Sequence, residues 1–275
     1  MNSVFFAGGP HTGKSTYLAL LVLAITQQRR VSLALGSFKD DREYVMELAR
    51  SLVLCEPQPR TNVDERRGLS LSIALPDRES EILEVPDLSG EIWKELLTER
   101  TWTLELEQRV GQSQGLCIFV NAARFAEDPT LTDVDRARAA LGINNDETLG
   151  ANVKFAVDEP MGQLALVDLI QILARQPGGP RRIALIVSAF DSSGETQPGE
   201  WLTACAPLAR QYLGANADSL PIRIYGLSAQ GGDFEKKDER TKLRTLNAVE
   251  RASVLREDGS ATDLDEPVRW AMGID

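Results

Sequence analysis

The sequence is poor in the residues that build metal centres and disulfide frames. Its 275 residues include one histidine, His11, and three cysteines, Cys55, Cys117 and Cys205. The cysteines are odd in number, lie far apart and sit in apolar stretches, which favours packed, reduced thiols over disulfide bonds. We therefore assign no chemistry to the cysteines.

Long hydrophobic runs are also missing. The longest, YLALLVLAI at 17–25, is shorter than the roughly 20 apolar residues that cross a bilayer, and it predicts a buried helix. The N-terminus, MNSVFFAGG, has no basic segment and runs directly into a glycine motif, unlike a signal or transit peptide. We expect a cytoplasmic protein with no membrane span.

Basic residues are outnumbered by acidic ones, 30 to 41, for a formal charge of −11. This charge opposes binding to the phosphate backbone of nucleic acid or to anionic lipid. The two most basic stretches, 59–67 and 235–244, are both interrupted by acidic residues, a pattern that favours a solvated surface. We expect no nucleic-acid partner.

Apolar segments of strand length alternate with helical patterns along most of the chain. This alternation is typical of a mostly parallel sheet covered by helices on both faces, so we predict a three-layer α/β fold. The main strand candidates lie at 3–9, 115–122, 181–191 and 221–229. The main helix candidates lie at 13–30, 39–54, 91–110, 160–177 and 199–215.

Two strand-like segments, 69–75 and 80–90, are separated by PDRE, which predicts a tight turn and an antiparallel edge on the sheet. Two stretches depart from the alternation: 121–160 is polar, and 231–263 is charged and contains glycine. We interpret them as an insertion and a loop of a single domain spanning 1–275, which ends in a short helix around EPVRWAM.

The segment GGPHTGKS, residues 8–15, matches the pattern G-x-x-x-x-G-K-S/T. The backbone N–H groups of such a loop surround phosphate at the start of a helix, and the motif here follows a predicted strand and opens a predicted helix. It predicts the P-loop NTPase fold. The expected nucleotide-binding residues are Gly8, Gly9, Pro10, His11, Thr12, Gly13, Lys14, Ser15 and Thr16.

Individual roles follow from the chemistry of this loop. Lys14 would contact the β- and γ-phosphates, and the hydroxyl of Ser15 would bind Mg²⁺. Thr16 would cap the helix or contact the α-phosphate. His11 lies at the crest of the loop, where we expect a surface or nucleotide-flanking side chain rather than a general base.

A second motif, DLSG, places Asp87 at the end of a predicted strand and Gly90 three residues later. The carboxylate could hold Mg²⁺ through a water, while the Gly90 N–H meets the γ-phosphate. In this order, the two motifs resemble those of Ras-like, translation-factor-type GTPases of the TRAFAC clade. The resemblance implies GTP/GDP and Mg²⁺ as ligands.

The resemblance also implies residues that act in hydrolysis. A threonine before the antiparallel strands closes on Mg²⁺ and the γ-phosphate in such GTPases, and Thr61 is the one threonine between residues 31 and 68; a solvated loop threonine is the alternative. Glu91 occupies the place of their water-orienting glutamine. Three interpretations are open: the Glu91 side chain points away from the site, it acts as a base with a raised pKa, or intrinsic turnover is slow. We favour slow turnover, because a carboxylate beside the γ-phosphate is electrostatically disfavoured.

Guanine recognition in these GTPases uses N/T-K-x-D after a buried strand. Here the segment is SAFD at 188–191, so Asp191 is the candidate for binding the base, and Ala189 replaces the lysine whose stem stacks on it. Asp191 could instead cap the turn DSSGE. A later strand ends in Ser228, Ala229 and Gln230, the place where the backbone of these GTPases lies beside the base.

The finer pattern resembles the bacterial double-GTPase families, which implies a protein partner such as a second GTPase, an effector or an activator. We expect a GTP-hydrolysing switch. The partner or the insertion would supply an arginine finger; for Arg124 in that insertion, a solvated surface position is the better interpretation. The alternatives are an ATPase or small-molecule kinase, suggested by Ala189, and a scaffold without turnover, suggested by Glu91.

Overall fold

The computed structural model describes residues 4–38, 42–57, 67–75, 78–87, 103–126, 162–175 and 182–274, together with positions 93, 96, 97, 99–101, 136 and 139. Within 35–38, 67–72, 74–75 and 78–87 the description covers the backbone alone. The predicted insertion at 121–160 therefore lies largely outside the described residues.

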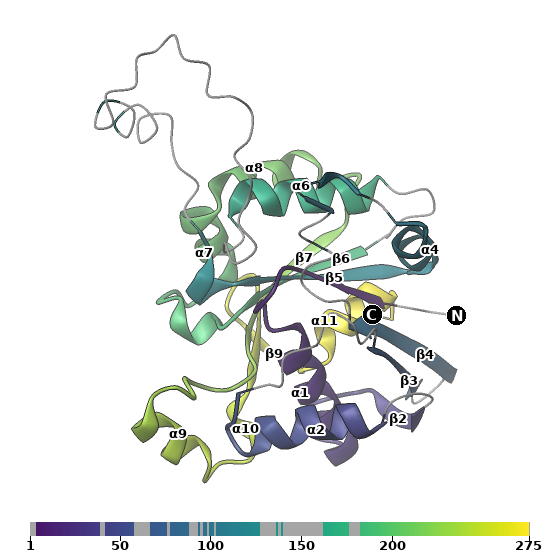
Figure 1. Cartoon of the computed structure of the whole chain (residues 1–275), viewed down its shortest axis with the longest axis vertical. Coiled ribbons are helices and arrows are strands. Elements are labelled where there is room, and N and C mark those ends of the chain that lie inside the picture. The colour runs from purple at the N-terminus through teal and green to yellow at the C-terminus, as the bar shows by residue number, and fades with distance from the viewer. Residues whose placement is uncertain are drawn as a thin grey trace.

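A six-stranded sheet forms the centre of the molecule (Figure 1). Its order is β1-β5-β6-β7-β8-β9; the first four strands pair parallel, and β8 pairs antiparallel with both β7 and β9. This arrangement confirms the predicted α/β class. The strands are β1 (Val4–Ala7), β5 (Gly115–Asn121), β6 (Arg182–Ser188), β7 (Ile222–Ser228), β8 (Ser253–Arg256) and β9 (Ala261–Thr262).

The antiparallel pair predicted from PDRE also forms, but within a second sheet. The strands β2 (Ala34–Phe38), β3 (Arg67–Leu75) and β4 (Arg78–Asp87) make this three-stranded sheet in that order. It packs beside β1 through β4. The antiparallel edge of the central sheet is instead built by β8 and β9, at its opposite end.

Helices cover both faces of the central sheet (Figure 1), and each face buries its own hydrophobic core. One face carries α1 (Lys14–Gln27), α2 (Arg42–Val53), α10 (Ala248–Arg251) and α11 (Glu266–Met272). The other carries α4 (Leu104–Gln112), α6 (Gln163–Ala174), α7 (Pro198–Cys205) and α8 (Pro207–Ala215). A further helix, α9 (Lys237–Leu243), packs beside α10 near the C-terminus of α2.

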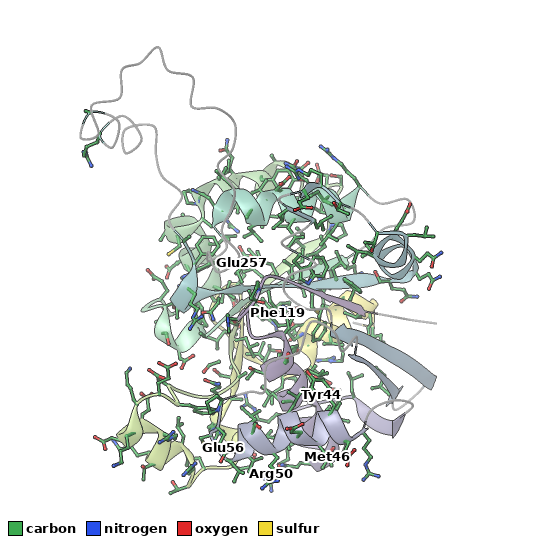
Figure 2. All side chains as sticks on the ribbon, in the orientation of Figure 1. Tyr44, Met46, Arg50, Glu56, Phe119 and Glu257 are labelled. Carbon is green, nitrogen blue, oxygen red and sulfur yellow. The ribbon has the colours of Figure 1, made fainter. Side chains whose placement is uncertain are left out.

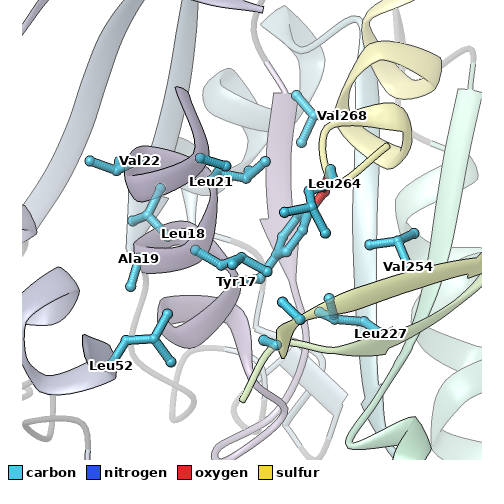
Figure 3. Close-up of a cluster of buried hydrophobic side chains, with 14 of the residues drawn as sticks. Tyr17, Leu18, Ala19, Leu21, Val22, Leu52, Leu227, Val254, Leu264 and Val268 are labelled. Carbon is cyan, nitrogen blue, oxygen red and sulfur yellow. The ribbon is translucent and has the colours of Figure 1, made fainter. Parts of the chain in front are cut away.

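The apolar run 17–25 is a buried helix, as predicted. Figure 3 shows its residues Tyr17 and Leu21 on the side of α1 that faces Leu264 and Val268. The Tyr17 hydroxyl donates a hydrogen bond to the Leu264 carbonyl over 2.8 Å, and burial raises the pKa of that hydroxyl well above its usual range. The C-terminal segment is thereby anchored to α1.

The helix α2 has one buried side and one exposed side, since its apolar residues recur at helical spacing. Tyr44 and Leu48 are buried, and Met46 is half exposed. Figure 2 shows Tyr44 on the side of α2 that faces the sheet, and Met46 and Arg50 on the outer side. The sequence pattern at 39–54 therefore locates this helix correctly.

Two predicted helices are interrupted. The candidate at 199–215 forms α7 and α8, separated at Ala206, because Pro207 has no N–H to continue the first helix and instead starts the second. The candidate at 91–110 is broken before α4, where Arg100 has a φ of 54°. The Thr103 side chain then caps α4 by accepting a hydrogen bond from the Leu106 N–H over 3.2 Å.

The segment 231–263 is more ordered than the charged loop that its composition predicts. It contains α9, α10, β8 and β9. Four apolar side chains hold these elements on the core, namely Phe234, Leu243, Val249 and Val254, all of them buried. The widely spaced apolar residues, rather than the charge between them, decide the structure of this segment.

Asp265 connects the C-terminal segment to the start of β2. Its carboxylate is fully buried, and one oxygen accepts hydrogen bonds from the N–H groups of Ser32 and Leu33, each over 2.8 Å. Arg269 contacts the other oxygen at 3.2 Å. Burial raises the pKa of Asp265 above its usual range, against the opposing effect of these N–H groups and of Arg269.

This raised pKa predicts a pH-dependent stability. The folded protein holds the Asp265 proton at pH values where the unfolded chain, with a pKa of about 3.9, has lost it. The stabilisation from this group is therefore complete below about pH 4 and is lost as the pH rises through the folded pKa. Urea unfolding of wild type and Asp265→Asn should show that the advantage of wild type shrinks from pH 4 to 7; an advantage that is constant or grows with pH would contradict this assignment.

Candidate functional site

The loop of residues 8–13, which the sequence predicts to bind phosphate and which we call the phosphate loop, connects β1 to α1 and is closely packed at two of its glycines. Gly8 has a φ of 147°, and a Cβ there would lie 2.6 Å from the Phe119 carbonyl oxygen. Gly13 has a φ of 87°, and its Cβ would lie 3.1 Å from Ser188 Cβ. The loop thus lies directly against the ends of β5 and β6, with no room for a Cβ at Gly8 and a tight contact, on a left-handed backbone, at Gly13.

Lys14 turns its ammonium group back toward this loop. Its Nζ donates to the carbonyls of Gly8 over 2.7 Å and of Gly9 over 2.8 Å. The buried Thr12 hydroxyl donates to the same Gly9 carbonyl over 2.8 Å. The helix α1 begins after Gly13 without a side-chain cap, so its first N–H groups, which a helix cannot pair internally, point toward the loop together with the positive end of the helix dipole.

The remaining loop positions differ in exposure. Pro10 and His11 are exposed, and His11 has a φ of 57°. Ser15 and Thr16 are half-buried in the first turn of α1, and among the described residues neither hydroxyl has a hydrogen-bond partner.

Two polar side chains at neighbouring strand ends form hydrogen bonds with backbone carbonyls of the loop. Asn121, at the end of β5, donates through Nδ2 to the His11 carbonyl over 2.8 Å. Ser188, at the end of β6, is buried; its hydroxyl lies 2.8 Å from the Thr12 carbonyl and 3.2 Å from that of Val120. Sequence reasoning missed Asn121, although a polar residue that ends a buried strand beside the loop-bearing strand is a usable signal.

The segment SAFD leaves the sheet at the same edge. Ala189 is half exposed and has a φ of 49°, and Phe190 is buried. They lead into η2 (Phe190–Ser192), where Asp191 is exposed. Ser193, rather than Asp191, caps the following turn. Its hydroxyl donates to the Phe190 carbonyl over 2.7 Å and accepts from the Glu195 N–H over 3.1 Å.

Ser228 and Ala229 are buried at the end of β7, and Gln230 is half-buried. Because Ser188 pairs with Leu227 across the sheet, the ends of β6 and β7 are adjacent. The Ser228 hydroxyl is inaccessible to solvent and has no hydrogen-bond partner within the described part of the chain. Leaving a buried hydroxyl unpaired costs free energy.

The residues expected to act on the γ-phosphate are placed only in part. Asp87 is the last residue of β4, where the backbone alone is described. Thr61, Gly90 and Glu91 lie outside the described residues. The structure therefore brings together residues 8–16 with the ends of β5, β6 and β7, the two sides expected to hold phosphate and base.

A large groove of about 1240 Å³ lies elsewhere, between α7, β7, β8 and α11. It contains the N-terminal half of β7, away from the strand ends that contact the phosphate loop. Its charges largely neutralise one another, as in the pair of Arg256 with the buried Glu266 at 2.6 Å. This groove offers no net positive field for a phosphate chain.

Among the described helices, none has the length and apolar character needed to cross a membrane. A comparison with curated protein sequences finds no match. The structure of Sup35 complexed with GDP shares 12% identity, with a TM-score of 0.35; the alignment covers 84% of this chain and only 38% of that one.

Two smaller GTPase structures align over nearly their full lengths. The signal recognition particle receptor from Chaetomium thermophilum shares 11% identity, with 89% of this chain and 96% of that one covered and a TM-score of 0.41. A probable GTP-binding protein, EngB, shares 14% identity, with 90% and 98% covered and a TM-score of 0.36.

A family model covers still more of the chain, because residues 5–271 match the family Double-GTPase 1. The resemblance to P-loop GTPases inferred from the motifs is thereby confirmed. With this match over almost its whole length, the chain belongs to the Double-GTPase 1 family.

Proposed function

We propose that the protein binds GTP and GDP with Mg²⁺ at residues 8–16, hydrolyses the β–γ phosphoanhydride slowly on its own, and acts as a switch through a protein partner. The phosphate loop is the observation that carries this proposal. Its glycines pack directly on β5 and β6, and Lys14 lies over the Gly8 and Gly9 carbonyls at an uncapped helix start.

The residues present fit a triphosphate. The absence of side chains at Gly8 and Gly13 lets the backbone curve closely, and the N–H groups at the start of α1 attract an anion. Lys14 would exchange its two backbone acceptors for phosphate oxygens. Ser15 would hold Mg²⁺ with Asp87 and Thr61; when bound, Mg²⁺ neutralises charge on the β- and γ-phosphates.

The base would lie between the ends of β6 and β7. Asp191 is exposed and is not used to cap its own turn, so its carboxylate can accept hydrogen bonds from two guanine N–H groups. On the other side, the segment Ser228, Ala229 and Gln230 would lie along the base.

Ala189 offers a test of this placement by gain of affinity. Its φ of 49° already lies in the left-handed region, so Ala189→Lys keeps the backbone and restores the stem and ammonium that stack on the base in related GTPases. We expect GDP to bind about two- to fivefold more tightly, the range for an exposed cation over an aromatic ring. Fluorescence titration of wild type, Ala189→Lys and the uncharged Ala189→Met checks this; unchanged or weaker binding in both variants would count against the placement.

Hydrolysis depends mainly on positioning and on neutralising charge, with water as the nucleophile. Glu91 stands where related GTPases carry a water-orienting glutamine, and a second anion near the γ-phosphate slows attack. A partner would raise the rate by supplying an arginine, an effect of about 10³ to 10⁵. Arg124, exposed at the end of η1 (Ala122–Arg124), fits a solvated surface position better than this role.

Competition between nucleotides tests the proposed substrate. Excess GTP, but not excess ATP, should displace a fluorescent guanine nucleotide from the protein. Equal displacement by ATP would favour the ATPase or kinase alternative, for which the alanine at 189 is the supporting observation. Displacement by neither would leave no support for either enzyme.

Single-turnover release of phosphate separates a switch from a scaffold. With GTP bound to excess protein, we expect slow phosphate release that accelerates when the activating partner is added. A complete lack of release under both conditions would favour a nucleotide-binding scaffold, the alternative suggested by Glu91.

A further inference from the structure

Two glycines follow the segment proposed to lie beside the base, and the first of them is pressed against α10. Gly231 has a φ of 73°, and a Cβ there would lie 2.5 Å from the Arg251 carbonyl oxygen and 2.9 Å from Arg251 Cβ. Only glycine fits this contact. The turn that leaves Gln230 is therefore fixed by the last residue of α10.

The guanidinium of Arg251 contacts three other residues, Phe234, Leu243 and Leu52. It lies 5.3 Å from the ring centroid of Phe234, a buried residue in the same turn. Its Nη1 donates to the Leu243 carbonyl over 2.8 Å, and its Nη2 donates to the Leu52 carbonyl over 2.6 Å. One side chain thus joins the turn 231–234 to the C-terminal ends of two helices, α9 and α2.

These acceptors suit an arginine. The last carbonyls of a helix have no partner within the helix and carry the negative end of its dipole, so a cation there is favourable. Arg251 Nη1 also lies 3.1 Å from Sγ of Cys55, which lies two residues after the end of α2 and has a φ of 53°. The planar guanidinium can reach both helix ends and stack on Phe234 at once, which an ammonium cannot do.

We propose that Arg251 is a positioning residue for guanine recognition: it fixes the turn 231–234 against α2 and α9, and through this turn it holds Ser228–Gln230 in place beside the base. The inference rests on the proposed function of that segment. Arg251 does not contact the phosphate loop in the structure, so its effect is confined to the base side of the nucleotide. Loss of Arg251 should weaken binding through the base and spare binding through the phosphates.

The test compares a ligand that has a base with one that has none. Affinities for GTP and for inorganic tripolyphosphate, each with Mg²⁺, are measured by displacement of a fluorescent guanine nucleotide from wild type and from Arg251→Ala. We expect the GTP affinity to fall at least tenfold and the tripolyphosphate affinity to change by less than twofold. Arg251→Lys, which keeps the charge and some donors, should recover part of the GTP affinity.

Two further variants sharpen the comparison. Gly231→Ala leaves the guanidinium intact but forces the turn away from the Arg251 carbonyl, so it should reproduce the selective loss of GTP affinity even where Arg251→Ala folds poorly. Arg244→Ala is the matched control: Arg244 donates to the Leu54 carbonyl at the same end of α2 over 2.8 Å, but it does not contact the turn. Its affinities for both ligands should equal those of wild type.

The outcomes are distinct. Unchanged GTP affinity in Arg251→Ala and Gly231→Ala would overturn the inference while leaving the proposed function intact. An equal loss of both ligands, accompanied by a lower unfolding temperature, would also overturn it, because Arg251 would then support only the fold. If wild type bound tripolyphosphate as tightly as GTP, the base would contribute nothing to binding. The proposed base contact would then be wrong, and so would the inference that rests on it.

Discussion

Lys14→Ala is expected to weaken GTP binding in magnesium buffer by at least about a hundredfold. The variant removes the one ammonium group that the structure places against the Gly8 and Gly9 carbonyls. Charge-assisted hydrogen bonds contribute about 1.5–3 kcal/mol each, and this group would form two of them with the β- and γ-phosphates. A titration with a fluorescent guanine nucleotide, followed by displacement with GTP, measures the change.

Lys237→Ala is the matched control for this prediction. It removes the same charge from an exposed position in the first turn of α9, away from the phosphate loop. Its affinity should equal that of wild type, and both variants should unfold at about the wild-type temperature. If Lys14→Ala, still folded, bound GTP as tightly as Lys237→Ala does, the phosphate site would not be at residues 8–16.

Asp191→Asn is expected to change the base preference of the protein from guanine to xanthine. The carboxylate would accept hydrogen bonds from two N–H groups of guanine, whereas an asparagine offers one acceptor and one donor, which matches the N–H and the carbonyl of xanthine. Two charge-assisted hydrogen bonds are lost, so GDP affinity should fall about a hundredfold or more, and xanthosine diphosphate should bind more tightly than GDP. Competition between the two diphosphates measures the ratio.

Asp218→Asn serves as its control, because this exposed aspartate lies in the loop before β7 and changes the net charge equally. We expect its preference for guanine to remain that of wild type. Unchanged GDP affinity in Asp191→Asn would mean that the base lies elsewhere, and the proposed roles of Asp191, Ser228, Ala229 and Gln230 would fall together.

Local patterns predict those parts of the fold that depend on local chemistry. The strand before Gly8, the apolar helix after Lys14 and the buried strands that end in Asn121, Ser188 and Ser228 all have continuous apolar runs, which fix their place in a covered parallel sheet. The close turn before α1 was predictable because its glycines and lysine are adjacent in the sequence, whereas its binding of phosphate stays a prediction.

Features that depend on contacts between distant segments were not predictable. Asn121 and His11 meet only because β5 pairs with β1. The strands β8 and β9 lie in a charged segment whose few apolar residues, such as Val254, give no periodic signal. Arg251 is one of many arginines in the sequence, and its role depends on the folded positions of Leu52 and Leu243.

Assignments by resemblance at Thr61, Gly90 and Glu91 lie outside the described residues and stay predictions. The residues proposed to contact the base are described. The turn after Asp191 is capped by Ser193, and the Ser228 hydroxyl lacks a partner among the described residues. The Ser193 cap leaves the exposed Asp191 carboxylate accessible to a ligand, and its proposed contact with a base stays a prediction.

The central claim is that the loop between β1 and α1 is a pocket for the phosphate chain of a nucleotide. Isothermal titration calorimetry of the wild-type protein with GTP and with ATP, in magnesium buffer, tests it most directly. We expect measurable heat and one site per chain for GTP, with much weaker binding of ATP. The absence of heat for both nucleotides at millimolar concentration would contradict it.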